Sequence, residues 1–371
     1  MRFAFTEEQD ALRAGMRRFL RDKSPEPEVR RLMASDDGYD PAVWKQLADQ
    51  LGLQSLIIPE QFGGSGYSYV ELMIVLEEMG NALLCAPYYS TIALATNALL
   101  TSGDRAAQAD YLPSIASGDT IATLAWVEDD GTWNLTDTRL SAGHEDGVWT
   151  LRGHKSFVLD GTVADLLLVV GQAEAGLSLF AVEQDAPGLV RHGLTTLDQT
   201  RKQARIEFVD TPARLIGFAG RAHAGLSKTL DLAVVALAAE QVGGAQRCLD
   251  SSVSYAKTRF QFGRPIGSFQ AIKHRCADMQ VEVEAARSAA YYAGWSAAED
   301  AADLAVAASV AKSCCSDAFA AAAAETIQIH GGIGFTWEHP AHLYLRRAKS
   351  AELMFGDSPY HRELLAARLG I

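Results

Sequence analysis

Hydrophobic and polar residues follow a helical period from the N-terminus to about residue 118. Asp40 and Pro41 supply a helix cap and a first-turn proline, and the apolar residues after them recur on one helix face. The turn-rich segment 59–68 separates this helix from a second one, and a third helix is expected over residues 91–100. We therefore predict an N-terminal helical domain over residues 1–118.

The period of the pattern shortens from about 3.6 residues to two after Gly118. Short segments rich in Val, Leu, Phe and Trp are separated there by Gly, Asp and Pro, which is typical of antiparallel strands in a barrel or sandwich. These segments are residues 147–152, 166–170, 177–182 and 204–209. The pattern predicts a middle β domain over residues 119–221.

From residue 222 the pattern is helical again, with long runs rich in Ala and Leu. The predicted helices cover residues 226–255, 272–299 and 303–329, and a last helix runs through Leu369. Several long helices in succession favour a bundle. The sequence thus predicts a mainly α fold with a β insertion, whose C-terminal helical bundle covers residues 222–371.

Composition and charge narrow the class of protein. Apolar residues make up 48% of the 371-residue chain and charged residues 21%, which is typical of a globular protein with several packed units. The net charge of −13 disfavours nucleic acid and anionic membranes as partners. The longest apolar run, residues 232–239, is too short to cross a bilayer, and the N-terminus lacks the pattern of a secretory signal. We expect a cytoplasmic protein.

Cysteine usage argues against disulfides. The chain has five cysteines, an odd number, and Cys314 and Cys315 are neighbours in an Ala-rich helical stretch. No CxxC pattern is present. Buried free thiols are therefore expected.

The stretch TRFQFGRPIGSFQAIKHRCADM, residues 258–279, is the densest in candidate chemistry. Arg259 and Arg264 flank Gly263 in a break between two predicted helices, and the next helix starts near Ser268. A guanidinium group and the amides of a helix N-terminus could bind a pyrophosphate there. A helical corner with solvated arginines is the other interpretation.

The second stretch is QIHGGIGFTWEHP, residues 328–340. Its glycines follow a predicted helix and permit either a helix C-cap or a close approach to a cofactor. The three histidines His330, His339 and His342 match no compact ligand spacing, and no Cys or carboxylate set accompanies them. No metal site is expected.

Together these stretches resemble the acyl-CoA dehydrogenase family. Co-linear matches extend the resemblance along the whole chain, at residues 58–66, 77–80, 151–170 and 238–250. The resemblance implies an N-terminal helical domain, a middle β domain and a C-terminal four-helix bundle that forms a tetramer core. It also implies FAD bound between subunits, with much of its ADP half held by the neighbouring chain. The matching cofactor-binding positions are Arg259, Phe262, Phe269, Gln270, Gln328, Gly331 and Gly332.

The catalytic base of the family is not retained. Members remove the α-proton of the thioester with a carboxylate in an apolar pocket. Counting without gaps from Gln328, the matching residue is Phe355, and Ala233 stands where some relatives place the base instead. Asp357 and Glu240 are weak substitutes for this base. The side chain of Asp357 leaves the backbone in a different direction from that of residue 355, and Glu240 lies about 10 Å along its helix from Ala233.

Positions that meet the flavin ring in the family also differ. The family's Thr-Glu-Pro-Gly-like loop corresponds to residues 127–130, Val-Glu-Asp-Asp, and its Trp-x-Thr pair corresponds to residues 157–159, Phe-Val-Leu. The Asp-x-x-Arg pattern is broken because Asp231 is followed by Val234. The hydroxyl groups expected at the ring are therefore missing.

Intact ADP positions beside a lost catalytic half resemble the small or β subunit of heterotetrameric acyl-CoA dehydrogenases, of the pimeloyl-CoA or steroid side-chain CoA type. The implied partners are a larger homologous subunit that supplies the base and most of the acyl-CoA pocket, and an electron-transfer flavoprotein or similar acceptor.

Three alternatives stay open. The chain could form an autonomous homotetramer that uses Asp357 or Glu240 as its base. It could be a flavin monooxygenase or oxidase on the same fold, or a non-catalytic structural pseudoenzyme.

Overall fold

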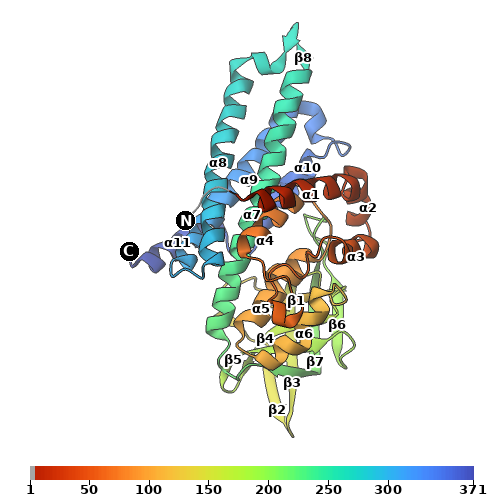
Figure 1. Cartoon of the computed structure of the whole chain (residues 1–371), viewed down its shortest axis with the longest axis vertical. Coiled ribbons are helices and arrows are strands. Elements are labelled where there is room, and N and C mark those ends of the chain that lie inside the picture. The colour runs from red at the N-terminus through yellow and green to blue at the C-terminus, as the bar shows by residue number, and fades with distance from the viewer. Residues whose placement is uncertain (1–4) are drawn as a thin grey trace. The chain divides into compact units, whose positions relative to one another are not determined.

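The computed structural model describes residues 5–371 and contains helices, then strands, then helices, as predicted (Figure 1). The α-helices are α1 (Glu7–Lys23), α2 (Glu26–Met33), α3 (Pro41–Asp49), α4 (Tyr69–Ala82), α5 (Asn97–Thr101), α6 (Arg105–Ala116), α7 (His223–Thr258), α8 (Gln270–Ala298), α9 (Leu304–His330), α10 (Ala341–Leu353) and α11 (Ser358–Leu369). The strands are β1 (Ala122–Ala125), β2 (Ser141–Glu145), β3 (Val148–Leu159), β4 (Leu166–Ala173), β5 (Gly176–Glu183), β6 (Leu189–Gly193), β7 (Gln203–Ile216), β8 (Phe260–Gln261) and β9 (Arg264–Pro265).

The chain divides into two compact units. The bundle unit comprises the described residues up to Val29, Tyr69–Leu84 and Val234–Ile371. The sheet unit comprises Arg30–Ser68 and Cys85–Ala233. The three-domain boundaries drawn from the sequence, at residues 118 and 221, stay a prediction.

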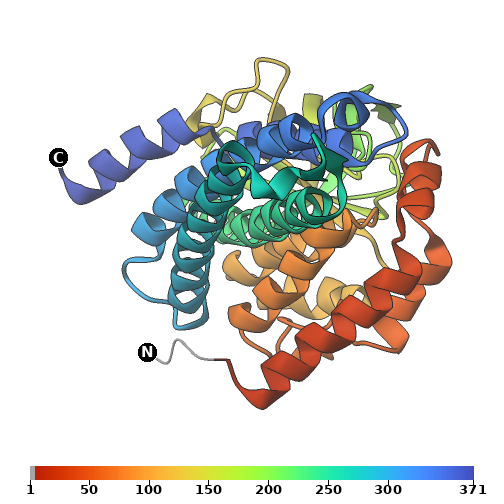
Figure 2. The ribbon, with the colours of Figure 1, turned by 90° about the horizontal axis from the view of Figure 1, so that it is seen from above.

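The bundle unit is organised around α9, which packs against α8, α10 and α11. Figure 2 shows α11 at the periphery of these helices, where the chain ends. The segment Leu304–Phe335 is long and apolar enough to cross a membrane by length and composition, but 61% of its most apolar window is buried within the protein. That burial is typical of the central helix of a globular core.

Charged residues tie α1 and α8 to α4. Glu77 and Glu78 on α4 are almost completely buried. Arg13 bonds to both carboxylates, Arg17 bonds to Glu78 at 2.8 Å, and Arg287 of α8 bonds to Glu77. Because buried carboxylates are costly without partners, this network fixes the three helices relative to one another.

The sheet unit contains a seven-stranded sheet in the order β1-β4-β2-β3-β7-β5, with β6 beside β7. Strand β5 also pairs with β4, so the strands close on themselves as in a small barrel. Most pairs are antiparallel as predicted, but β1 runs parallel to β4. The sequence pattern missed β1, β2 and β6, and it shortened β3, whose alternation is broken by register shifts near Gly153 and Lys155.

The helix expected at residues 91–100 has a different form. Tyr89–Thr96 is a π-helix whose residues are all buried, and only Asn97–Thr101 is α-helical. The Thr96 hydroxyl donates to the Thr91 carbonyl at 2.9 Å, which the wider π turn permits. Packing on all sides decides this geometry, and the sequence period does not reveal it.

Candidate functional site

The first part of the candidate site is the corner where β8 and β9 join α7 to α8 (Figure 1). A cavity of about 380 Å³ opens there. Its walls bring together Arg259, Phe262 and Phe269 with Ile329 and His330 at the end of α9. Three predicted cofactor positions, Arg259, Phe262 and Phe269, therefore line this cavity, whereas the other four, Gln270, Gln328, Gly331 and Gly332, are not among its lining residues.

Two features of this corner suit an anionic ligand. Helix α8 begins at Gln270, and no side chain caps its first turn, so its positive end is open to a ligand. Gly331 ends α9 with a φ of +63°, and a Cβ atom added at Gly331 or Gly332 would meet nothing within 4 Å. The turn at Gly331 and Gly332 therefore leaves open space at the C-terminal end of α9, which allows a nucleotide to approach the backbone closely.

Large apolar side chains at this corner are uncovered. Phe262 is 90% exposed and adopts a φ of +54°, and Phe260 on β8 is 59% exposed. Exposed aromatic residues in a cluster are typical of a surface completed by a ligand or another chain. The residues present fit an adenine nucleotide, and their contact with FAD stays a prediction.

The second part is the turn at the usual base position. The structure places Phe355 between α10 and α11, 9% exposed and with a φ of +61°. Its carbonyl accepts a hydrogen bond from Nε2 of the buried His361 at 2.9 Å. A phenyl ring accepts no proton, so Phe355 itself supplies no base.

Two titratable side chains that sequence reasoning missed hold this turn. Lys312 is fully buried on α9 and donates to the carbonyls of Ala351 and Glu352, at 3.1 and 3.0 Å, which end α10. Burial lowers the pKa of Lys312 to about 8 and that of His361 to about 4. In the sequence, Lys312 stands out only as the one Lys or Arg between residues 304 and 330.

Neither candidate substitute base has a free carboxylate. Asp357 caps α11, because its side chain accepts from the Tyr360 amide at 2.8 Å. Glu240 is 5% exposed and forms an ion pair with Arg347, itself 3% exposed. Both carboxylates thus have structural partners within the bundle unit.

Other side chains also pack over Ala233, the position where the resemblance puts the base of some relatives. Ala233 is completely buried, and the hydroxyl of Tyr89 donates to its carbonyl at 2.6 Å. The guanidinium carbon of the buried Arg201 lies 5.1 Å from the centre of the Tyr89 ring. These side chains occupy the space beside Ala233 within the sheet unit.

The acids in the loop at residues 127–130 are engaged within the sheet unit. Glu128 accepts from Nζ of the fully buried Lys155 at 2.9 Å and from the amides of Arg139 and Leu140. Burial opposes ionisation of Glu128, but these donors outweigh it and lower its pKa. Asp129 pairs with Arg205 at 3.2 Å. The loop is therefore stabilised by the chain's own cations.

Comparisons with known proteins agree with this architecture. Residues 6–119 match the acyl-CoA dehydrogenase N-terminal domain, and residues 225–370 match the acyl-CoA dehydrogenase C-terminal domain. Acyl-CoA dehydrogenase IpdE2 of Mycobacterium tuberculosis is 37% identical over 97% of this chain and 95% of its own length.

Solved structures are similar over nearly the whole chain. A variant of the Tcur3481-Tcur3483 steroid ACAD has a TM-score of 0.89 at 32% identity, covering 98% of both chains. A chain of the ChsE4-ChsE5 complex from Mycobacterium tuberculosis has a TM-score of 0.90 at 28% identity, covering 100% of this chain and 99% of that one.

Fold and sequence matches together define a flavin-dependent oxidoreductase that acts on acyl-CoA, with FAD as its cofactor. The chain belongs to the acyl-CoA dehydrogenase family.

Proposed function

We propose that this chain is the small subunit of a heterotetrameric acyl-CoA dehydrogenase. In this assembly it contributes contacts to the ADP half of FAD, and a larger homologous partner contributes the base and most of the acyl-CoA pocket. The observation that carries the proposal is the buried Phe355, which stands where the resemblance puts the family's catalytic carboxylate. A chain without a proton acceptor there needs another chain for the α-proton.

Further support comes from the other base positions. Asp357 caps a helix, Glu240 is paired with Arg347, and Ala233 is covered by Tyr89. An autonomous enzyme would need one of these groups to give up its partner before it could accept a proton. The second subunit removes that requirement.

The corner at α7 and α8 explains why such a chain would be retained. FAD, when bound, supplies the hydride acceptor of the reaction. Arg259 and the uncapped start of α8 would hold the pyrophosphate, and the apolar wall with Phe262 and Phe269 would pack on the adenosine. The exposed aromatic side chains would become buried against the neighbouring subunit.

Similar proteins favour a bulky acyl group as substrate. One similar structure is described as a steroid ACAD, and another is a complex of two differently named chains. We propose a steroid side-chain CoA thioester, bound mainly by the partner, with an electron-transfer flavoprotein or similar protein as the acceptor. A dicarboxylyl-CoA such as pimeloyl-CoA is the other substrate class that the resemblance implies. A cytoplasmic location stays a prediction.

The first test counts subunits and flavin. The tagged chain is recovered from its native host and analysed by native mass spectrometry, with flavin measured by absorbance. We expect equal numbers of this chain and a larger homologous chain, with one FAD for each pair. A homotetramer that carries one FAD on every chain and reduces flavin with an acyl-CoA would refute the proposal.

A second test addresses the corner itself. Arg259→Ala in the native complex should lower FAD affinity about tenfold or more, because a hydrogen bond to a charged group is lost. Lys257→Ala is the matched control, since it removes a cation from the same helix end but does not line the cavity. Equal FAD retention in the two variants would contradict the assignment of the corner.

A further inference from the structure

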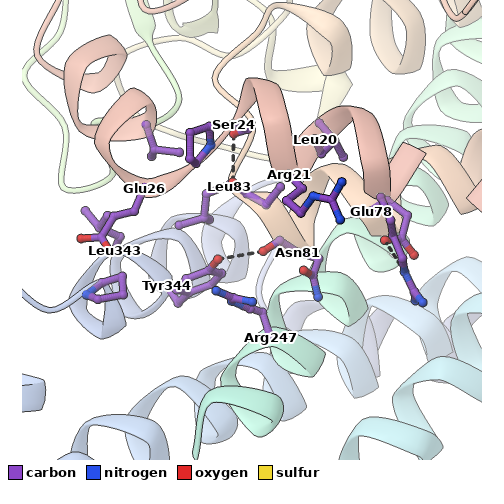
Figure 3. A pocket seen from close by; sticks show the side chains of 15 residues that line it. Leu20, Arg21, Ser24, Glu26, Glu78, Asn81, Leu83, Arg247, Leu343 and Tyr344 are labelled. Atoms are coloured by element: carbon purple, nitrogen blue, oxygen red, sulfur yellow. Dashed lines mark hydrogen bonds and ion pairs between the residues drawn. The ribbon is translucent and has the colours of Figure 1, made fainter. Parts of the chain in front are cut away.

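A second cavity, of about 360 Å³, lies within the bundle unit and shares no lining residue with the corner at α7 and α8. Figure 3 shows side chains of α1, α4, α7 and α10 converging on it. Its volume lies at the lower end of the range for small-molecule sites, about 300 to 1,000 Å³. A ligand of modest size would fit.

The lining is apolar at its base. Leu20, Val29, Leu83 and Leu343 are each at most 3% exposed, and Pro25 and Pro340 complete the wall. Leu83 is also held at a φ of +49°, which is unfavourable for a branched side chain. Such strain is often found where a backbone shapes a ligand site. This part of the cavity suits a hydrocarbon group.

The polar groups around the cavity favour an anion. Three arginines and two acids line it, but Arg17 is paired with Glu78 and Arg21 with Asp22 at 3.3 Å, so Arg247 is the cation left for a ligand. Of the acids, Glu78 is already neutralised by Arg13 and Arg17 at 3.0 and 2.8 Å, and Glu26 is also engaged within the chain.

Helix ends of both signs lie at the cavity. Helix α2 begins at Glu26 and α10 begins at Ala341, and Pro25 and Pro340 beside these starts line the cavity. Their positive ends therefore face it. The negative ends of α1 and α4 also reach the cavity, since Ser24 after α1 and Asn81 on α4 line it. At the end of α4, Tyr344 donates to the Asn81 carbonyl at 2.7 Å and Ser24 donates to the Ala82 carbonyl at 3.1 Å (Figure 3).

We propose that this cavity binds a small amphiphilic carboxylate, with the carboxylate near Arg247 and the hydrocarbon against the buried leucines. A guanidinium fork suits a planar carboxylate, and the apolar base distinguishes such a ligand from a bare inorganic anion. Any unactivated short or medium acyl chain has this chemistry. The proposal does not depend on the subunit role proposed above.

The test uses octanoate as the probe, with isothermal titration calorimetry on the native complex. Arg247→Gln removes the cation, and Ala82→Leu fills the cavity without changing charge. Each should weaken octanoate binding about tenfold or more. Lys257→Gln is the matched control, because it removes a cation from the same helix outside the cavity, and it should bind octanoate like the unmodified protein.

Two other probes separate the contributions. 1-Octanol has the same hydrocarbon without the charge, and inorganic phosphate has charge without the hydrocarbon, so each should bind about tenfold more weakly than octanoate. The proposal is overturned if octanoate does not bind, if either neutral octanol or phosphate binds as tightly, or if both cavity variants bind octanoate normally. Thermal unfolding of each variant confirms that it is folded.

Discussion

The ion pair between Glu240 and Arg347 gives a decisive prediction, because it separates a structural role from a catalytic one. Both side chains are buried, and the pair joins α7 to α10. If Glu240 is only a partner for Arg347, its removal should destabilise the protein. If Glu240 is the base, its removal should abolish turnover first.

The expected magnitude follows from the burial. Glu240→Ala removes the carboxylate that pairs with the guanidinium of Arg347, 3% exposed, and breaking a buried pair in this way costs about 3 to 5 kcal/mol. The double variant Glu240→Leu with Arg347→Met removes both charges and should regain most of that loss. Glu352→Ala is the matched control, since it breaks the more exposed pair with Lys349 on α10 and should cost at most about 1 kcal/mol.

Urea unfolding followed by circular dichroism measures these differences, with the native assembly at one fixed protein concentration. Reduction of flavin by an acyl-CoA is measured on the same samples. The reasoning is refuted if Glu240→Ala costs less than about 1 kcal/mol, or if the double variant is no more stable than the single one. Loss of flavin reduction at unchanged stability would identify Glu240 as the base.

Two further predictions concern pH and helix packing. Burial lowers the pKa of His361 to about 4. As the pH falls, this histidine is therefore protonated in the unfolded chain before it is protonated in the folded one. The free energy of unfolding should then fall by about 3 kcal/mol between pH 6.5 and 4. Urea midpoints across this range should change less in His361→Gln, and equal profiles would contradict the assignment. Gly80→Ala would place a Cβ 2.1 Å from the Glu240 carbonyl oxygen and should lower the melting temperature. Gly15→Ala, in open space on α1, should slightly raise it.

Much of the fold could be predicted from the sequence, because long amphipathic helices leave a clear period. Asp40 caps α3 as predicted, through bonds to the amides of Ala42 and Val43. The errors occurred where tertiary packing decides the geometry. The π-helix at Tyr89–Thr96 is buried on all sides, and β1 is a strand of only four residues, so neither carries a distinctive period.

The candidate site also contains both residues that the sequence indicates and residues that only the structure reveals. Arg259 and the glycines after Gln328 could be proposed from the sequence because their residue types and spacing suggest a chemistry, and their contact with FAD stays a prediction. Lys312 and His361 were not found, because their roles depend on burial and on backbone carbonyls from other helices. A lysine that donates hydrogen bonds to the last carbonyls of another helix has no recognisable pattern in the sequence around it.

The turn at Phe355 shows how a backbone shape can be kept without a carboxylate side chain at this position. A phenylalanine in the left-handed region costs about 1 to 2 kcal/mol, yet Phe355 has a φ of +61°. His361 holds its carbonyl, Lys312 ends the preceding helix, and Asp357 begins the next one. None of these contacts involves the side chain at position 355. Replacement of a carboxylate by phenylalanine there therefore removes the proton acceptor while the backbone of the turn keeps its supports.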